Sequence, residues 1–319
     1  MKILVLGAGA TGGYFAGRLV QAGADVTFLV RERRASQLAA HGLVVKSPLG
    51  DFQLPVIFVQ QHELRSDYAL VLLTCKAYDL DAAIAAIRPA LAPHTHVLPL
   101  LNGLAHIDRL IAEFGAARVL GGSCGIPGTL TPDGVVHQLA ALHRIVYGLL
   151  PGSSADARVK LETLHAHFQR TPVDAVLAGD ITLELWEKFV LLTTMAAMTT
   201  LMRGPVGDVL ETIEGEAIME ETLNACASTA LHAGYPVRAA SMAVFRKMLF
   251  ARGSAATASM LRDLEAGHRV EAEHVVGDML ARARACGVGP GPLRVAYAHL
   301  QTYEARQRRL QPASQAAWA

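Results

Sequence analysis

The chain carries little charge and has no long apolar run. Lys, Arg, Asp and Glu make up 18% of its 319 residues, and the formal net charge is +1. Because there is no long basic run, we expect no binding to nucleic acid or to an acidic membrane surface. No apolar run approaches the ~20 residues of a membrane-spanning helix. The N-terminus leads straight into a strand pattern instead of a signal peptide, so we expect a cytoplasmic protein whose partners are small molecules.

Cysteines are few and widely separated. The four of them, Cys75, Cys124, Cys226 and Cys286, form no Cys-x-x-Cys motif, which argues against a zinc site and a disulfide framework. The 13 histidines include pairs such as His94 and His96, whose spacing of two would turn the side chains apart on a helix. No carboxylate completes a ligand set, so no metal site is expected.

The chain does contain a glycine-rich turn near its N-terminus. An apolar run, residues 3–6, enters the sequence Gly7-Ala8-Gly9-Ala10-Thr11-Gly12. Gly7 permits a tight turn, Gly9 lets the backbone approach a pyrophosphate, and Gly12 lets the next helix pack closely. A helix-like segment follows, and its N-terminal amides would face the anion. In this strand–turn–helix context the motif predicts a dinucleotide site, with a glycine-rich turn that binds nothing as the alternative.

The end of the second apolar run bears on the choice of cofactor. Residues 26–30 lead into Arg31-Glu32-Arg33-Arg34. An NAD enzyme usually has Asp or Glu at this point, whereas an arginine can bind a 2′-phosphate with two hydrogen bonds, so NADPH is favoured over NADH. Two alternatives stay open: Glu32 facing the ribose would reverse the preference, and the basic cluster is also compatible with a solvated start of a helix.

The pattern of elements predicts two domains. With 52% hydrophobic residues the chain can bury large cores. Apolar runs at 68–74 and 96–101 alternate with a helical pattern at 79–91, which indicates a parallel α/β sheet. Strand patterns at 119–130, 135–139 and 144–149 are expected to be antiparallel strands appended to that sheet, and a helix is expected at about 155–169.

Strand signals end at Gly179-Asp180, and the remainder reads as helices. We expect them at 181–201, 206–232, 238–251 and 255–303, the last interrupted at Gly267 and at 287–292, while the polar tail 306–319 is expected to fray. The expected fold class is therefore α/β, with a Rossmann-type dinucleotide-binding domain (residues 1–179) followed by an all-helical C-terminal domain (residues 180–319).

Polar residues at the ends of two expected strands are candidates for chemistry, because parallel sheets bind ligands at the carboxyl ends of their strands. Lys76 follows the run 68–74, and Asn102 follows the run 96–101; both types are also common in solvated turns. Lys188 is the stronger candidate. It lies in a helical pattern that is apolar on most faces, where an ammonium group is costly to bury unless it is paired or used. Pairing with Glu184, one turn earlier, is the equally weighted alternative.

The ordered set of these segments resembles the ketopantoate (2-dehydropantoate) 2-reductase family across nearly the whole chain. The segments are residues 7–13, 73–77, 101–104, 185–189 and 259–263, followed by Glu271. The resemblance implies NADPH-dependent reduction of a 2-oxo acid to a 2-hydroxy acid, with 2-dehydropantoate to pantoate, and so pantothenate biosynthesis, as the first expectation.

The resemblance also implies roles for single residues. Lys188 matches the proton donor of the family, and Glu271 matches its acidic partner. Ser259 and Asn102 match substrate-contacting positions, Asn102 also contacts the cofactor, and Lys76 matches a lysine near the nicotinamide. A homodimer is compatible with this family.

The chain departs from the family pattern in one respect. Where members that make pantoate carry asparagines after the catalytic lysine, this chain has Leu192, Ala196 and Val206. The loss of polar contacts would weaken discrimination for a hydroxylated substrate. A paralogue that reduces a more apolar 2-oxo acid is therefore the alternative, with Arg203 as a candidate anchor for the substrate carboxylate.

Helix geometry adds a requirement on the predicted site. In one unbroken helix the twelve residues from Ser259 to Glu271 would span ~18 Å, too far for both to reach one small substrate. The helix must break between them, and Gly267 is suited to the break.

Two other function classes remain. A non-catalytic NADPH-binding regulator would need residues 7–12 but not Lys188 or Glu271. An opine-type dehydrogenase also combines a Rossmann domain with a helical one, but it usually relies on a His-Asp pair, of which the sequence shows no convincing example.

Overall fold

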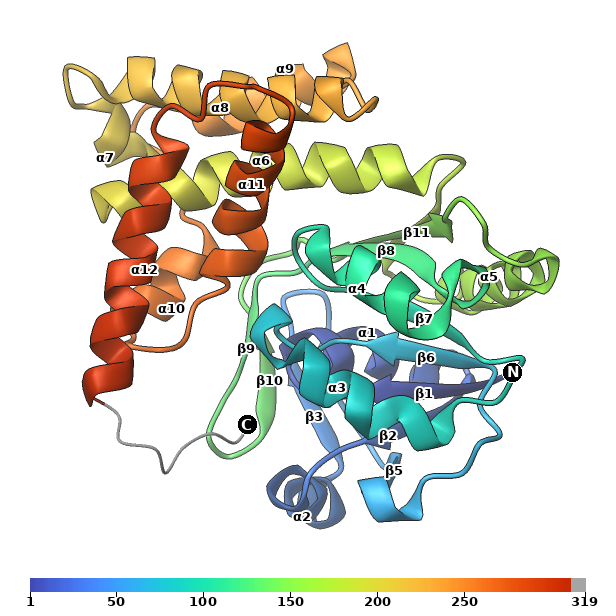
Figure 1. Cartoon of the computed structure of the whole chain (residues 1–319). Coiled ribbons are helices and arrows are strands. Elements are labelled where there is room, and N and C mark those ends of the chain that lie inside the picture. Colours follow the sequence, from blue (N-terminus) through green and yellow to red (C-terminus); the bar gives the residue numbers. More distant parts are fainter. Residues whose placement is uncertain (311–319) are drawn as a thin grey trace. The chain divides into compact units, whose positions relative to one another are not determined.

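The computed structural model describes residues 1–310, and the chain divides into two compact units. Unit 1 consists of Met1–Leu101 and His106–Ile181, and unit 2 consists of Asn102–Ala105 and the chain from Thr182 onward. Unit 1 contains strands with flanking helices, whereas every regular element in the described part of unit 2 is helical (Figure 1). This confirms the expected fold class. Among the described helices, none is both long and apolar enough to cross a membrane.

Unit 1 alternates strands and helices along the chain. Its strands are β1 (Lys2–Leu6), β2 (Asp25–Leu29), β3 (Leu43–Lys46), β4 (Phe52–Leu54), β5 (Ile57–Val59), β6 (Leu70–Leu73), β7 (His96–Pro99), β8 (Leu120–Gly125), β9 (Gly128–Leu130), β10 (Val135–Gln138), β11 (Arg144–Leu149) and β12 (Asp174–Leu177). Its helices are α1 (Ala10–Gln21), α2 (Glu32–His41), α3 (Leu80–Ile87), α4 (Ala105–Phe114) and α5 (Ala155–Phe168), with 3₁₀ turns at Gln61–Glu63, Ala77–Asp79, Arg88–Ala90 and Ala116–Arg118.

A five-stranded parallel sheet forms the centre of unit 1, in the order β5-β2-β1-β6-β7. Strand β1 pairs in parallel with β2 on one side and with β6 on the other. Residues 3–6 of β1 and 70–73 of β6 are all buried, which explains their nearly continuous apolar sequences. The carboxyl ends of β1, β2 and β6 therefore lie side by side at one edge of the sheet.

The sequence predicted that the strands at 119–130, 135–139 and 144–149 would all extend this sheet. This prediction is wrong, because they belong to two other sheets. Strands β9 and β10 pair antiparallel, but they belong to a separate sheet of order β4-β3-β10-β9. Strand β8 lies beside β7, joined by a bridge between Val97 and Val119, and pairs antiparallel with β11, which pairs in parallel with β12. Strands β3 to β5 are three or four residues long, too short for an alternating pattern to be recognised.

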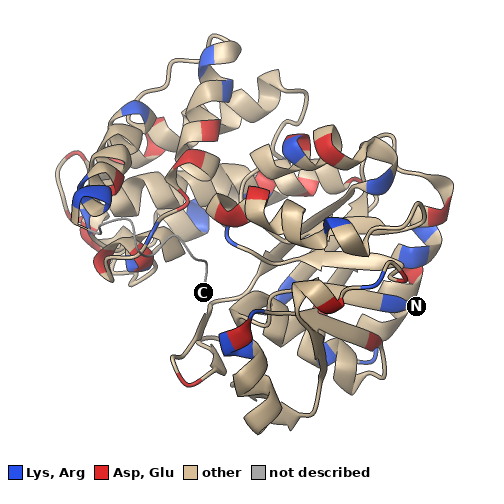
Figure 2. Ribbon diagram, turned by 60° about the horizontal axis from the view of Figure 1, so that its bottom comes forward, with Lys and Arg blue, Asp and Glu red and all other residues tan. Residues whose placement is uncertain are grey.

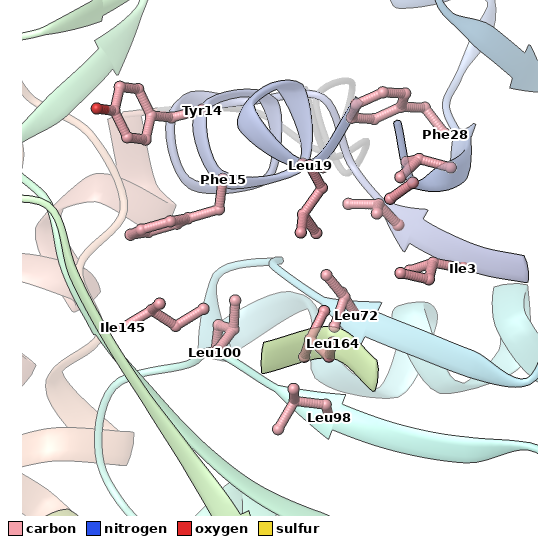
Figure 3. Close-up of a cluster of buried hydrophobic side chains, with 14 of the residues drawn as sticks. Ile3, Tyr14, Phe15, Leu19, Phe28, Leu72, Leu98, Leu100, Ile145 and Leu164 are labelled. Atoms are coloured by element: carbon pink, nitrogen blue, oxygen red, sulfur yellow. The ribbon is translucent and has the colours of Figure 1, made fainter. Parts of the chain in front are cut away.

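The core of unit 1 holds α1 against the strands. Figure 3 shows Phe15 and Leu19 of α1 pointing toward side chains of the strands, among them Leu72. All three side chains are almost fully buried. Burying a side chain of this size contributes roughly 1.5–3 kcal/mol. The N-terminus of α1, and with it the glycine-rich turn, therefore has a fixed position at the edge of the sheet.

Unit 2 is built from helices. They are α6 (Ile181–Met202), α7 (Val206–Leu210), α8 (Gly215–His232), α9 (Ala239–Leu249), α10 (Ser259–Glu265), a π-helix (Glu273–Gly277), α11 (Asp278–Ala285) and α12 (Leu293–Leu310). The chain breaks at Gly267, where φ is +73°, as the sequence predicted, so Ser259 and Glu271 lie in different segments. The expectation of a frayed tail is wrong for residues 306–310, which continue α12; residues 311–319 lie outside the described part.

Charges of both signs are interspersed over the ribbons of each unit (Figure 2). In unit 2 many of them pair between neighbouring helices, as Arg246 of α9 does with Glu220 of α8. Exposed pairs of this kind contribute less than ~1 kcal/mol each. The charge pattern of unit 2 is therefore mainly that of solvated helix faces.

Candidate active site

The glycine-rich turn joins β1 to α1. Gly7 has a φ of +95°, which favours glycine, and its N–H donates to the Leu29 carbonyl at 3.0 Å. A Cβ on Gly12 would overlap the Gly7 carbonyl oxygen and lie 2.5 Å from Thr74 Oγ1, whereas a Cβ on Gly9 would find no atom within 4 Å. The turn is thus closely packed behind Gly12 and open in front of Gly9.

This arrangement fits the pyrophosphate of a nicotinamide dinucleotide. Gly9 is the N-cap of α1, and the first N–H groups of a helix have no partner within it. Ala10, Thr11 and Gly12 supply those N–H groups, next to the open space in front of Gly9. Ala8, between the first two glycines, is almost fully buried. The turn can therefore bind an anion with backbone donors and the dipole of α1.

Lys76 follows the end of β6, next to this turn. Thr74 Oγ1 donates to the Leu6 carbonyl at 2.7 Å, which ties the end of β6 to the end of β1. Lys76 is exposed and is the N-cap of the 3₁₀ turn Ala77–Asp79. Because β1 and β6 are parallel neighbours, they bring Lys76 and the glycine-rich turn to the same edge of the sheet.

Arg31 follows the end of β2 and is the N-cap of α2. It is half-buried, whereas Glu32 is exposed. Burial lowers the pKa of Arg31, and the negative charge of Asp79 opposes this shift. The glycine-rich turn, Arg31 and Lys76 thus lie at the ends of three adjacent strands, which is the arrangement that a dinucleotide site requires.

Unit 2 brings together Asn102, Lys188 and Glu271. The Lys188 ammonium on α6 donates to Asn102 Oδ1 at 3.2 Å, and Asn102 Nδ2 donates to Glu271 Oε2 at 3.4 Å. Glu271 is 6% exposed, and Lys188 and Asn102 are half-buried. The carboxamide of Asn102 therefore links the Lys188 ammonium to the buried Glu271 carboxylate. These two residues lie 86 and 169 positions after Asn102 in the chain. The alternative pairing of Lys188 with Glu184 is not favoured, because the Glu184 carboxylate accepts from Arg238 at 2.5 Å.

A tight contact of Gly103 positions Asn102. Gly103 has a φ of +82°, and a Cβ at this residue would overlap the carbonyl oxygen of His274. His274 belongs to the π-helix that begins two residues after Glu271; such helices are rare and often lie at functional sites. The close approach of the two backbones thus places Asn102 within reach of Glu271.

An ion pair between the buried Glu187 and the exposed Arg238 anchors α6 next to Lys188. Glu187 is 4% exposed and accepts from the Arg238 backbone N–H at 2.8 Å, from Arg238 Nε at 2.9 Å and from Ser241 Oγ at 2.7 Å. Burial raises the pKa of Glu187, but the hydrogen bonds from Arg238 and Ser241 outweigh it, so the net pKa lies below its ordinary value. These bonds attach α6 to the start of α9.

Substitution of Arg238 by methionine is expected to lower the free energy of unfolding by ~2 kcal/mol, because the buried Glu187 carboxylate loses its countercharge, although that countercharge is itself half exposed. Urea unfolding can be followed by the fluorescence of Trp186, which stacks on Tyr235 nearby. Arg246→Met removes the exposed pair with Glu220 and is the matched control, with an expected loss below ~1 kcal/mol. Equal losses in the two variants would contradict the role assigned to Glu187.

Two other sequence candidates lie farther from Lys188. Arg203 follows the last residue of α6, fifteen residues after Lys188, and its role as an anchor for the substrate carboxylate stays a prediction. Ser259 begins α10 directly after Ala258, whose N–H donates to Thr199 Oγ1 at 3.4 Å, and Thr199 lies ~16 Å along α6 from Lys188. The role of Ser259 as a substrate-contacting residue stays a prediction.

Sequence reasoning did not identify Thr74, Gly103 or Arg34 as parts of the two sites. Thr74 and Gly103 adjoin residues that were identified, but their roles depend on contacts with segments far away in the chain. Arg34 was seen only as one member of a basic cluster. Its guanidinium in fact donates to the Ala8 carbonyl of the glycine-rich turn at 3.0 Å.

Comparison with known proteins shows where the chain belongs. The family model described as ketopantoate reductase PanE/ApbA matches residues 3–152, and the model of its C-terminal domain matches residues 180–304. The uncharacterized oxidoreductase YkpB of Bacillus subtilis is 32% identical over 307 residues, which cover 96% of this chain and 100% of that protein.

Solved structures agree with this result. The 2-dehydropantoate 2-reductase of Methylococcus capsulatus has a TM-score of 0.85 at 26% identity, and the match covers 97% of this chain and 98% of that one. A D-mandelate dehydrogenase, in a ternary structure with NADH and anilino(oxo)acetate, has a TM-score of 0.84 at 19% identity, covering 96% and 99% of the two chains. This second likeness shows a common fold alone.

Proposed function

Because the chain belongs to the ketopantoate reductase family and is thus an oxidoreductase, we propose that it reduces a 2-oxo acid to a 2-hydroxy acid with NADPH. The observation that carries the proposal is the series Lys188–Asn102–Glu271. A protein that only binds a dinucleotide has no need for a lysine held by an amide and a buried carboxylate. The first candidate substrate is 2-dehydropantoate, and the proposed location is the cytoplasm.

The proposed reaction uses the side chains of unit 2 as follows. NADPH, when bound, supplies the hydride that adds to the keto carbon. Lys188 donates a proton to the oxygen of the former carbonyl group, on which negative charge develops. Asn102 accepts a hydrogen bond from Lys188 Nζ and so orients the proton donor, while Glu271 holds the other end of the Asn102 carboxamide. Orientation of this kind lowers the entropic part of the barrier.

Arg31 is the proposed determinant of cofactor choice. Replacing it with alanine should weaken NADPH binding by roughly 10- to 100-fold, since charge-assisted hydrogen bonds to a phosphate are lost. NADH lacks the 2′-phosphate, so its affinity should change little. Titration of both cofactors by fluorescence tests this, with the exposed Arg33→Ala as the control. Equal affinity of the wild-type protein for NADPH and NADH, or an unchanged preference in Arg31→Ala, would remove Arg31 from this role.

A more apolar 2-oxo acid is the second candidate substrate, and Leu192 favours it. This residue lies one turn after Lys188, on the same face of α6, and is half-buried. Ala196, 1% exposed, and Val206, fully buried, stand at the other two positions where an asparagine is expected. Apolar side chains at these positions cannot form a hydrogen bond with a substrate hydroxyl group.

Two substrates that differ by one hydroxyl group separate the candidates. Trimethylpyruvate has the carbon skeleton of 2-dehydropantoate without its hydroxyl group. If that group meets an apolar wall, leaving it without a partner costs ~1–3 kcal/mol, so kcat/KM should favour trimethylpyruvate about tenfold or more. Phenylglyoxylate extends the comparison to an aromatic 2-oxo acid. A clear preference for 2-dehydropantoate would reject the apolar alternative and leave the general reaction intact.

A further inference from the structure

Arg34 connects three segments of unit 1 around the glycine-rich turn. From α2, its Nε donates to the Ala8 carbonyl at 3.0 Å. Its Nη1 donates to the Gly134 carbonyl at 2.7 Å and to Gln37 Oε1 at 3.2 Å. Gly134 lies in the turn between β9 and β10, and a Cβ on it would lie 2.7 Å from Arg34 Nη1. The guanidinium group therefore fills a confined space behind the peptide that joins Ala8 to Gly9.

The positive charge of Arg34 is not neutralised where it lies. Each acceptor bonded to it among the described residues is a neutral carbonyl or amide oxygen, and the buried Nη2 has no hydrogen-bond partner there. Burial lowers the pKa of Arg34 to about 10, so the group remains a cation at neutral pH. Arg31 differs in this respect, because the charge of Asp79 acts on it. An unbalanced buried cation is costly unless an anion completes the site.

The peptide between Ala8 and Gly9 transmits this charge toward the open side of the turn. A donor bonded to the Ala8 carbonyl polarises that peptide, which makes the N–H of Gly9 a stronger donor. A Cβ on Gly9 would meet no atom within 4 Å, so a ligand has room to approach there. The cation lies behind the peptide, and the space for an anion lies beside Gly9.

We propose that Arg34 is a positioning residue for the dinucleotide, whose charge acts on a phosphate group of the ligand through the Ala8–Gly9 peptide. The proposal rests on the proposed use of NADPH and extends it by one residue. The phosphate is either the pyrophosphate, which NADPH and NADH share, or the 2′-phosphate, which only NADPH has.

Three variants test the proposal through binding alone. Arg34→Gln removes the charge and keeps an amide donor, Arg34→Lys keeps the charge, and Arg33→Gln is the control, because exposed Arg33 bonds the same β9–β10 turn through the Pro132 carbonyl at 2.9 Å. We expect Arg34→Gln to raise the Kd for NADPH about tenfold or more. Arg34→Lys should recover most of this loss, and Arg33→Gln should stay within about twofold of the wild type, all measured by fluorescence titration.

The pattern of losses identifies the phosphate. An equal rise in Kd for NADPH and NADH assigns the pyrophosphate, and a rise confined to NADPH assigns the 2′-phosphate. Wild-type affinity in Arg34→Gln would overturn the proposal. So would equal losses in Arg34→Lys and Arg34→Gln accompanied by equal falls in Tm of the ligand-free protein, since those indicate a structural support and no effect of charge. Failure of the wild-type protein to bind either cofactor would instead reject the proposed function, and this inference with it.

Discussion

Replacing Lys188 by alanine is expected to lower turnover of the best 2-oxo acid by at least ~10²-fold, the usual scale for the loss of a general acid. The ammonium group is held by Asn102 Oδ1 at 3.2 Å, and no such donor remains in the variant. The glycine-rich turn and Arg31 belong to unit 1, so the Kd for NADPH should stay nearly unchanged. Steady-state kinetics and a cofactor titration on the same preparation measure both effects.

Lys247→Ala is the matched control for this variant. Lys247 is an exposed lysine on α9 of the same unit, and its loss should leave kcat unchanged. Glu271→Ala should lower turnover at the same step as Lys188→Ala, because Glu271 holds the other end of the Asn102 carboxamide. Full turnover in Lys188→Ala would show that the proton comes from another group.

Replacing Gly103 by alanine is expected to lower turnover by roughly 10²-fold, although Gly103 has no reactive group. The new Cβ would overlap the His274 carbonyl oxygen, so the turn that carries Asn102 must move away from the π-helix. A displacement of about 1 Å at a catalytic residue can cost ~10²-fold in rate. The Kd for NADPH should again change little, and circular dichroism should show that the variant is folded.

A second glycine separates backbone strain from displacement. Gly234 also has a positive φ, +87°, but a Cβ there would meet no atom within 4 Å. Gly234→Ala should therefore cost only ~1 kcal/mol of stability and leave turnover unchanged. If Gly103→Ala and Gly234→Ala behaved alike in both assays, the contact with His274 would not position Asn102.

The arrangement of the candidate cofactor-binding residues in unit 1 was largely predictable from sequence. Parallel strands end at one edge of a sheet, so a glycine-rich turn after β1, an arginine after β2 and a lysine after β6 must come close together. The packing around them was not predictable. Thr74 donates a hydrogen bond to a backbone carbonyl 68 positions away in the chain, and Arg34 donates one to a carbonyl 26 positions away. No local sequence pattern encodes such contacts.

The proposed catalytic residues of unit 2 depended on the family resemblance for their identification and on the structure for their geometry. Helical periodicity left Lys188 equally compatible with pairing to Glu184, and only the fold shows that Glu184 bonds Arg238 instead. The break at Gly267 could be derived from helix dimensions alone. The π-helix could not, because a single-turn bulge of this kind leaves no periodic signal in sequence. The grouping of β9 and β10 with β3 and β4 was missed for a similar reason, since strand pairing across the chain is not a local property.

The stoichiometry of the reaction tests the central claim most directly. The purified protein is incubated with NADPH and a panel of 2-oxo acids that includes 2-dehydropantoate, trimethylpyruvate and phenylglyoxylate, and both NADPH consumed and 2-hydroxy acid formed are measured. The account predicts one 2-hydroxy acid for each NADPH with at least one substrate, and loss of this activity in Lys188→Ala. A protein that binds NADPH tightly but reduces no member of the panel would contradict it and favour a regulator that senses the cofactor.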